Sequence, residues 1–323
     1  MKRIGVFTSG GDSPGMNACI RAVVRSAIDS GLEVCGIKRG YNGIIAGDIE
    51  VLNSRNVSNV IQRGGTFLKS ARSKEFMTIE GRQKAHAQLM EKGIEGLVAI
   101  GGDGTFTGAM VFEKEFGFPM VGIPGTIDND LYGTDSTIGY DTALNTVVEA
   151  VDKIRDTAHS HDRLFIVEVM GRDAGFIALR SGIAVGAEAI LVPETTTYIE
   201  QLLHKIQTDW KKNKTSSIVV VAEGDDYGGA YKVADAVRVK YDHFDIKVTI
   251  LGHVQRGGSP SAYDRVLASR LGVEAVRSLK SGKNGVMIGV QNNQLSYTPF
   301  EKAIKYNKEL NQSLLELVRV LSI

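Results

Sequence analysis

Three loops rich in glycine, aspartate and hydroxyl residues have the composition of a phosphate-binding site. They are Thr8–Asn17, Ile100–Thr105 and Pro124–Asp130, and each follows a short apolar run. Amphipathic stretches follow the first two loops, so their glycines would present backbone N–H groups at the start of a helix, where an anion binds readily. The loops therefore predict a bound phosphate, and the alternative for each is a plain strand-to-helix turn.

Carboxylates in these loops could hold a metal ion and accept a proton. Asp103 offers the hard oxygen ligand that Mg²⁺ takes, usually together with retained waters, although an Asp here could also only cap the next helix. Asp128 and Asp130 lie two residues apart, so one could accept a proton while the other helps to hold the metal or a cation. An Asx-rich turn is the simpler interpretation of that pair. Two Gly-Gly-Asp loops in one half of the chain together favour a nucleoside triphosphate bound with its metal.

Polar residues also follow apolar runs in the second half of the chain. They are Met170-Gly171-Arg172, Glu223 and the segment Gly252–Pro260, which contains His253 and Arg256. Arginine and histidine side chains would form a basic pocket for a phosphorylated small molecule. Glu223 could accept hydrogen bonds from sugar hydroxyls. A surface ion pair is the ordinary role of one such arginine, but three loops of this kind favour a site.

These loops require strands that run parallel, because ligands of open α/β sheets bind at the carboxyl ends of the strands. The apolar runs predict strands at Ile4–Thr8, Glu33–Ile37, Gly96–Ile100, Met120–Ile123, Phe165–Val169, Ala189–Val192, Ile218–Ala222, Lys247–Leu251 and Gly285–Val290. The longer amphipathic stretches predict helices at Met16–Ser30, Gln83–Lys92, Gly104–Phe116, Tyr140–Thr157, Ala174–Ala184, Tyr198–Lys211, Tyr231–Tyr241 and Asp264–Ser281. This alternation predicts an α/β fold with mostly parallel strands, divided into two sheets around residue 139.

Composition restricts the class of protein. The 323 residues suit two domains, and 37 glycines beside only 6 prolines indicate tight turns rather than a disordered chain. A net charge of +1 gives no bulk field for nucleic acid or a membrane surface. Cys19 and Cys35, the only cysteines, cannot build a disulfide framework. No apolar run has the length of a membrane helix or a signal peptide, so we expect a cytoplasmic protein without nucleic-acid or membrane partners.

The motifs, taken together, resemble those of bacterial ATP-dependent 6-phosphofructokinases. They occur in the order of that family and cover nearly the whole chain, whereas Gly-Gly-Asp-Gly alone also resembles NAD and lipid kinases. The resemblance implies transfer of the ATP γ-phosphoryl group to the 1-hydroxyl of fructose 6-phosphate. It also implies two Rossmann-like three-layer lobes with the active site in the cleft between them. Residues 1–139 plus 252–302 would bind ATP, and residues 140–251 plus 303–323 would bind the sugar.

The resemblance assigns roles to individual residues. Asp128 would be the base, Thr126 and Arg172 would stabilise the transferring phosphoryl group, and Asp103 would hold Mg²⁺. ATP would contact Gly11, Tyr41, Arg72, Ser73, Phe76, Gly102, Asp103, Gly104, Thr105 and Gly108. Fructose 6-phosphate would contact Thr126, Ile127, Asp128, Met170, Gly171, Arg172, Glu223, His253, Val254, Gln255 and Arg256, with Arg163 and Lys247 reaching it from a neighbouring subunit. Lys247 stands where the family usually has Arg, which predicts weaker binding of the sugar phosphate because lysine lacks the bidentate fork.

Two glycines bear on the phosphoryl donor. Gly104 and Gly125 match the ATP-using branch, whereas the pyrophosphate-using branch carries Asp and Lys there, which fill the room that the α-phosphate needs. We therefore expect ATP as the donor.

The family is also a homotetramer with an effector pocket for ADP or phosphoenolpyruvate. The positions that match this pocket are Arg21, Ala22, Val23, Val24, Arg25, Arg155, Gly186, Ala187, Glu188, Lys212, Lys214, Thr215 and Ser216. Glu188 would bind the magnesium ion of ADP. Arg21 and Arg25 lie four residues apart, so a solvated helix face is their alternative. Ser54 and Ser216 depart from the residues usual at two effector positions.

Two other functions stay open at this point. A kinase of another acceptor, such as NAD or a lipid, would share Gly-Gly-Asp-Gly but leaves Met170–Arg172 and His253–Gly258 unexplained. A nucleotide or sugar-phosphate sensor without catalysis would bind the same ligands, but it has no need of a base such as Asp128. The sequence favours the phosphofructokinase reaction over both.

Overall fold

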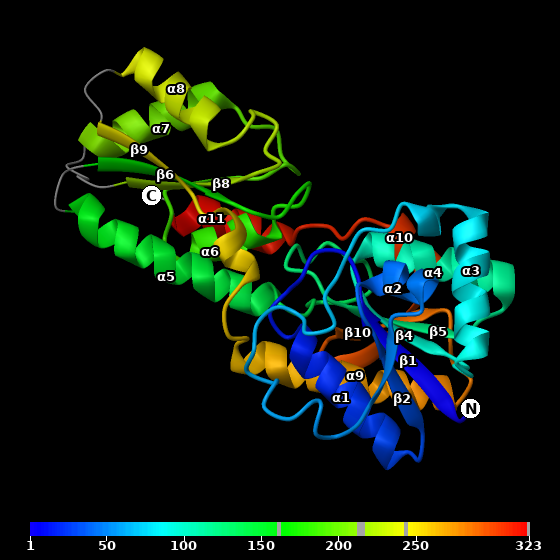
Figure 1. The fold of residues 1–323 in the computed structure, drawn as a ribbon. Helices are drawn as coiled ribbons and strands as arrows, with labels where there is room; N and C mark the ends of the chain where they lie inside the picture. The colour runs from blue at the N-terminus through cyan, green and yellow to red at the C-terminus, as the bar shows by residue number, and fades with distance from the viewer. Residues whose placement is uncertain (160–162, 212–216, 242–244, 322–323) are drawn as a thin grey trace. The chain divides into compact units, whose positions relative to one another are not determined.

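The computed structural model describes residues 1–159, 163–211, 217–241 and 245–321 (Figure 1). The chain divides into two compact units. The first unit comprises residues 1–127, 131–142 and 256–308, and the second comprises 128–130, 143–255 and 309–323. The breaks after residues 142, 255 and 308 fall a few residues beyond those expected after 139, 251 and 302. Residues 128–130, which the sequence analysis expected in the first lobe, belong to the second unit.

The first unit is built on a seven-stranded sheet with the strand order β11-β10-β5-β4-β1-β2-β3. The central strands are parallel, and only the edge strands β3 and β11 run antiparallel to their neighbours. Buried strands of this kind are apolar on both faces. The strands are β1 (Arg3–Thr8), β2 (Glu33–Ile37), β3 (Ile49–Leu52), β4 (Leu97–Gly101), β5 (Met120–Pro124), β10 (Val286–Gln291) and β11 (Gln294–Pro299).

Helices cover both faces of this sheet, which makes three layers (Figure 1). Ile4 and Val6 of β1 pack under α1 and α9, whereas Phe7 faces the opposite side and packs under the other helices. This alternation follows the two-residue period of a strand. The covering helices are α1 (Met16–Asp29) and α9 (Ala262–Lys280) on one face, and α2 (Gly40–Ala46), α3 (Ile79–Glu91), α4 (Asp103–Phe116) and α10 (Phe300–Lys305) on the other.

The second unit is built on a four-stranded parallel sheet with the order β7-β8-β6-β9. Helices α7 and α8 lie on one face, and α5, α6 and α11 lie on the other (Figure 1). The strands are β6 (Arg163–Val169), β7 (Ala189–Leu191), β8 (Ser217–Ala222) and β9 (Asp245–Ile250). The helices are α5 (Tyr140–His159), α6 (Phe176–Ala184), α7 (Ile199–Lys211), α8 (Ala230–Lys240) and α11 (Gln312–Leu321).

The predicted α/β class, with two mostly parallel sheets, is confirmed. Each predicted strand and helix is present with small shifts at its ends; α3, for example, begins at Ile79 because the hydroxyl of Thr78 caps it by accepting from Gly81 N. The sequence missed the edge strands β3 and β11, the helices α2, α10 and α11, and the short 3₁₀ turns η1 (Glu75–Met77) and η2 (Gly252–Arg256). Within the described ranges, none of the helices is long and apolar enough to cross a membrane.

Candidate functional site

The loops that follow β1 and β4 lie side by side at the carboxyl end of the first sheet. The chain leaves β1 toward β2 on one side and later returns to β4 on the other, and such a reversal is where open α/β sheets bind ligands. Ser9 N donates to Ile100 O at 3.0 Å. A β-carbon on Gly101 would lie 2.5 Å from Ser9 O, so glycine is required for this close approach.

Both loops lead into helix N-termini, whose N–H groups and dipole favour an anion. Helix α1 begins after Gly15, which has a φ of 105°, and α4 begins after Gly102 with Asp103 exposed in its first turn. A β-carbon on Gly104 would meet no described atom within 4 Å. Room for a ligand group therefore exists beside the first turn of α4.

Gly125 differs from Gly104 in its surroundings. A β-carbon on Gly125 would lie 3.0 Å from Ile100 Cγ2 and 3.1 Å from Met16 Cε, so this glycine is enclosed by the core. A larger residue at 125 would have to displace these side chains before it reached a ligand. The argument from glycine size about the phosphoryl donor therefore rests on Gly104.

Arg256 contacts the first glycine loop. Its Nη1 donates to Asp12 O at 3.2 Å, and a β-carbon on Gly11 would lie 2.6 Å from the same nitrogen. The sequence grouped Arg256 with Arg172 and His253, but the structure assigns Arg256 to the first unit and the other two to the second. A cation thus lies directly beside the backbone that we expected to receive phosphate.

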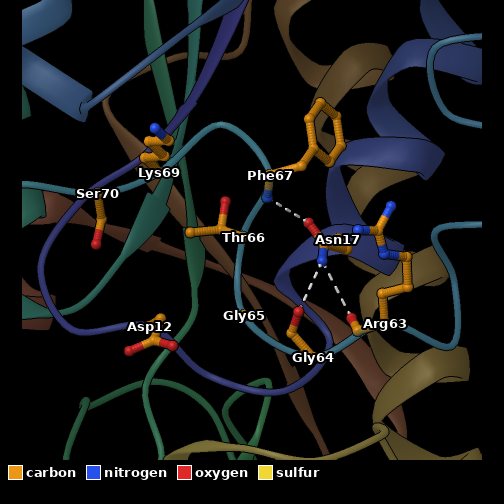
Figure 2. Close-up of a pocket in the computed structure, with 9 residues that line it drawn as sticks. All are labelled: Asp12, Asn17, Arg63, Gly64, Gly65, Thr66, Phe67, Lys69 and Ser70. Carbon is orange, nitrogen blue, oxygen red and sulfur yellow. Dashed lines mark hydrogen bonds between the residues drawn. The ribbon is translucent and has the colours of Figure 1, made fainter.

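A cavity of about 440 Å³ lies next to Asp12, and the sequence gave no indication of it. Figure 2 shows the side-chain amide of Asn17 holding the wall of this cavity. Asn17 Nδ2 donates to Arg63 O at 3.1 Å and to Gly64 O at 3.0 Å, and its Oδ1 accepts from Phe67 N at 2.8 Å. The available signal was a polar amide on the apolar face of α1. The lining residues are Asp12, Asn17, Arg63, Gly64, Gly65, Thr66, Phe67, Lys69 and Ser70.

The residues expected to hold adenosine pack mainly against one another. Tyr41 stacks on Phe76 with ring centroids 3.9 Å apart, and both rings are buried. Tyr41 Oη donates to Thr105 O at 2.6 Å, and a β-carbon on Gly108 would lie 2.9 Å from the Tyr41 ring. Burial raises the pKa of Tyr41 above its usual range. The Tyr41 and Phe76 rings lie in the core beside α4, and their expected contact with the adenosine stays a prediction.

Arg72 and Ser73 lie in the chain between Ser70, which lines the cavity, and Phe76. The Arg72 side chain is exposed, while its carbonyl oxygen accepts from Asn42 Nδ2 at 3.1 Å. Ser73 Oγ accepts from Phe76 N at 3.2 Å. The Arg72 guanidinium is thus available to an anion at the surface of the first unit, whereas Ser73 shapes the turn.

The loop after β5 is fixed by backbone contacts. Thr137 Oγ1 donates to Thr126 O at 2.6 Å, and Ile138 N donates to Pro124 O at 2.9 Å. Thr126, Ile127 and the carboxylate of Asp128 are buried. Asp128 Oδ2 lies 3.5 Å from Arg172 Nε. The two residues that the sequence assigned to proton acceptance and charge stabilisation are therefore brought together.

Backbone strain and a carboxylate fix the turn that carries Arg172. Arg172 has a φ of 52°, a left-handed conformation that is uncommon for a side chain of this size. Its N–H donates to Glu223 Oε1 at 2.7 Å, and Gly171 N donates to the same oxygen at 3.2 Å. Gly224 must be glycine, because a β-carbon there would lie 2.0 Å from Arg172 O. Glu223 thus positions the turn with one of the oxygens that we expected to receive sugar hydroxyls.

The segment after β9 divides into an exposed and a buried part. His253 and Val254 are exposed, whereas Gln255 is fully buried. Gln255 Oε1 accepts from Met170 N at 3.2 Å, and its Nε2 donates to Gly252 O at 2.9 Å. Gln255 therefore supports Met170 and Gly252 with its amide, and its expected contact with fructose 6-phosphate stays a prediction.

Arg163 and Lys247 share one carboxylate. Asp245 Oδ2 lies 2.6 Å from Arg163 Nε, and Asp245 Oδ1 lies 2.7 Å from Lys247 Nζ. Hydrogen bonds from Lys247 first and Arg163 second hold the pKa of Asp245 below its usual range. The sequence missed Asp245, although it lies two residues before Lys247 on the same face of β9.

The expected effector positions separate into exposed and buried residues. Arg25 is exposed and Arg21 half-buried on α1, and burial, together with the nearby charge of Arg25, lowers the pKa of Arg21. Val23 and Val24 lie in the core cluster that α1 shares with the sheet, and Ala22 is buried against Gly272 of α9. The expected effector contacts at these three positions stay a prediction.

The effector positions of the second unit gather near the start of β7. Arg155 donates to Val185 O, directly before Gly186, which has a φ of 60°. Ala187 and Glu188 are buried, and Glu188 Oε2 accepts from Ile218 N at 2.6 Å. The expected role of Glu188 as a ligand of the magnesium ion of ADP stays a prediction. Lys212, Lys214, Thr215 and Ser216 lie outside the described residues.

The carboxylates can be tested for a magnesium site. Within the ranges that the structure describes, no three His, Cys, Asp or Glu side chains converge to hold a metal ion. A single exposed carboxylate at Asp103, beside the open space at Gly104, fits a different arrangement. Mg²⁺ commonly binds through one or two carboxylates, waters and the phosphates of its substrate. Asp103 suits that arrangement.

The chain is similar to known proteins over its whole length. Residues 3–279 match the family model described as phosphofructokinase. The chain is 57% identical to ATP-dependent 6-phosphofructokinase 2 of Bacteroides thetaiotaomicron, covering 100% of this chain and 99% of that protein. It is also 57% identical to ATP-dependent 6-phosphofructokinase 1 of Thermus thermophilus, with full coverage of both.

Solved structures extend the likeness to the fold. Phosphofructokinase from Saccharomyces cerevisiae superposes with a TM-score of 0.90 at 38% identity, and this chain, matched in full, spans 47% of that yeast chain. A pyrophosphate-dependent phosphofructokinase from Marinobacter aquaeolei shares the fold at 22% identity, with a TM-score of 0.84 and coverage of 99% and 91%. On the full-length identity and the family match, the chain belongs to the phosphofructokinase family.

Proposed function

We propose that this phosphotransferase moves the γ-phosphoryl group of ATP to the 1-hydroxyl of fructose 6-phosphate and so forms fructose 1,6-bisphosphate and ADP. The observation that carries this proposal is the buried carboxylate of Asp128, 3.5 Å from the guanidinium of Arg172. Relatives 57% identical over the full chain are named for the same reaction. A base beside a cation is what transfer of a phosphoryl group to a hydroxyl requires.

In this proposal, the first unit binds ATP. The N-termini of α1 and α4 supply N–H groups to the phosphates at Gly11 and at Gly102–Gly104, and Arg72 adds a cation. Bound Mg²⁺ would neutralise charge on the phosphates, and Asp103 is the residue placed to hold it. The open space at Gly104 supports ATP over pyrophosphate, because it leaves room for the α-phosphate.

The reacting groups have separate tasks. Asp128 accepts the proton of the 1-hydroxyl while that oxygen attacks the γ-phosphorus and ADP leaves. Thr126 and Arg172 stabilise the charge on the transferring group, which is spread over its oxygens in a loose transition state. Hydrogen-bond donors that the fold already holds in place contribute most to such a reaction, because they do not have to reorient when the charge develops.

Sugar binding is assigned to the second unit. Met170, Gly171 and Arg172 present the turn held by Glu223, and His253 is exposed two residues before Gln255, which accepts from Met170 N. In a homotetramer, Arg163 and Lys247 would reach the sugar phosphate of a neighbouring subunit. Arg21 and Arg25 of the first unit, and the Arg155–Glu188 region of the second, would bind ADP or phosphoenolpyruvate as effectors.

Replacement of the base tests this proposal. We expect Asp128→Asn to lower kcat by roughly a thousandfold, the usual contribution of a general base, with little change in the KM for ATP. A coupled assay of ADP release measures both. The control is Asp152→Asn, an exposed carboxylate on α5, which should leave kcat unchanged. Near-normal turnover by the Asp128 variant would remove Asp128 from the mechanism.

The same assay separates the alternative functions. Purified protein is supplied with Mg²⁺, with ATP or pyrophosphate as the donor, and with fructose 6-phosphate or NAD as the acceptor. We expect turnover only with ATP and fructose 6-phosphate. Phosphorylation of NAD alone would favour a kinase of another acceptor, and binding without ADP release would favour a sensor.

A further inference from the structure

One buried carboxylate has no place in the reaction as proposed. Asp264, in the first turn of α9, is fully buried. It accepts three hydrogen bonds from the segment that begins α5, namely from Gly139 N at 2.9 Å, Thr142 N at 2.8 Å and Thr142 Oγ1 at 2.6 Å. A buried carboxylate is costly unless donors compensate it, so this arrangement calls for a reason.

The starts of two helices cap each other around Asp264. Ser261 caps α9 by accepting from Asp264 N at 3.2 Å, and an acidic residue at the third position usually returns a bond to the cap N–H. Here the Asp264 carboxylate binds the N-terminus of α5, while Ser261 N donates to Thr142 Oγ1 at 2.9 Å. Both helix dipoles favour a negative charge at this point.

The opposing effects on Asp264 can be ranked. Burial raises its pKa to about 6, against the lowering effect of its bonds from Thr142 and Gly139. The carboxylate of Asp141, which accepts from Ser261 Oγ at 2.6 Å, adds to the rise.

The segment held by Asp264 touches the two loops assigned to chemistry. On one side, Ile138 N binds Pro124 O and Thr137 Oγ1 binds Thr126 O. On the other side, a β-carbon on Gly15 would lie 2.7 Å from Ile138 Cγ2. Residues 137–139 are thus packed between the first glycine loop and the loop that carries Thr126.

We propose that Asp264 is a positioning residue, which fixes residues 137–142 and thereby holds Thr126 in its reactive place. This inference rests on the proposed role of Thr126. It predicts that weakening the Asp264 contacts lowers kcat, because Thr126 acts on the transition state, and leaves substrate binding nearly unchanged.

Three variants of the full-length protein test it. Asp264→Asn keeps the shape but replaces one acceptor oxygen by an amide that repels the N–H donors. Thr142→Val removes one hydroxyl that bonds to both Asp264 and Ser261, and Thr142→Ser restores that hydroxyl. Ser278→Ala is the matched control, since it removes a buried hydroxyl near the other end of α9.

The expected result is a separation of kcat from KM. We expect Asp264→Asn to lower kcat by about tenfold to a hundredfold and Thr142→Val by about tenfold, with both KM values within about twofold of wild type. Thr142→Ser should recover most of kcat, and Ser278→Ala should lower thermal stability without lowering kcat. Rates are referred to folded protein, measured by circular dichroism. If Asp264→Asn does not fold, the Thr142 pair decides.

Two contrary results have different meanings. Wild-type kcat in folded Asp264→Asn or Thr142→Val, or a rise in KM alone, would show that the cluster is only structural and would overturn the inference. Normal turnover by Asp128→Asn would overturn the proposed function itself. The Asp128 variant is therefore assayed in the same series.

Discussion

The two units present their candidate ligand groups in opposite ways. In the first unit the loops after β1 and β4 offer bare backbone at two helix N-termini. They approach each other so closely that a β-carbon on Gly101 would lie 2.5 Å from Ser9 O. In the second unit the turn after β6 offers a charged side chain, Arg172, held by Glu223 in a left-handed conformation. The first unit thus offers backbone N–H groups shaped for an anion, whereas the second unit offers one placed positive charge.

The difference predicts how each site fails. A site made of backbone is damaged by added atoms, because a side chain fills the space that the ligand needs. A site made of a held side chain is damaged by removed atoms, because the charge or its support is lost. Three substitutions test this contrast.

Removal of the held charge should have the largest effect. We expect Arg172→Ala to lower kcat by about a hundredfold to a thousandfold, since it deletes a cation that stabilises the transferring group. Arg172→Lys should recover only part of this loss, because an ammonium lacks the planar fork of a guanidinium. Steady-state kinetics measure both.

The control for this substitution is Arg180→Ala, an exposed arginine on α6 that should behave as wild type. Equal losses in the Arg172 and Arg180 variants would mean that the second unit does not depend on one placed charge.

Addition of atoms to the backbone site should have an intermediate effect. We expect Gly104→Asp to fold normally, since a β-carbon there meets no described atom within 4 Å and an acid suits the first turn of a helix. Its carboxylate should raise the KM for ATP by roughly tenfold through repulsion of the phosphates. Kinetics at varied ATP and a thermal melt check the two parts.

Gly104→Ala is the matched control, with an expected change in KM below about twofold. An unchanged KM for ATP in the Gly104→Asp variant would show that ATP does not bind beside the first turn of α4. The first unit would then not be a site made of backbone, and the contrast between the units would be wrong.

Removal of the carboxylate that Arg163 and Lys247 share should have the smallest effect. Asp245→Asn removes the partner of both Arg163 and Lys247, whose cations are proposed to meet the sugar phosphate. Exposed ion pairs are weak, so we expect the KM for fructose 6-phosphate to fall by only about twofold to threefold. The salt dependence of this KM should become steeper.

Asp235→Asn, which breaks an exposed pair with Arg238 on α8, controls for the loss of a surface charge. A rise in KM for Asp245→Asn would mean that Asp245 orients the two cations instead of competing for them.

Much of the fold could be predicted from local patterns. Buried strands such as β4 and β6 are continuous apolar runs, and the loops at their carboxyl ends follow from the α/β order. Short edge elements were missed because their signals are weak. The β10–β11 hairpin turns at Asn292 and Asn293, both with positive φ, and this pair is a hairpin signal that the apolar pattern does not contain.

The parts of the site that depend on distant partners could not be read from the sequence. Asp264 follows a helix-capping serine, so local rules predict a cap for α9, yet its carboxylate binds residues 122 and 125 positions away. The role of Asp245 could not be predicted either, because its ion pair with Arg163 depends on the register of β6 with β9. The burial of Gln255 could not be predicted either, because its partner Met170 lies 85 residues away in the chain.

The discontinuous first unit has a consequence for the order of synthesis. Strand β10, which pairs with β5, and helix α9, which covers α1, come from residues 256–308, after the whole central segment 143–255. At typical translation rates, the apolar face of α1 and the open edge of β5 wait roughly ten seconds for their partners. During that interval apolar surface of the nascent chain stays uncovered, and a ribosome stalled within the central segment leaves the first unit unfinished.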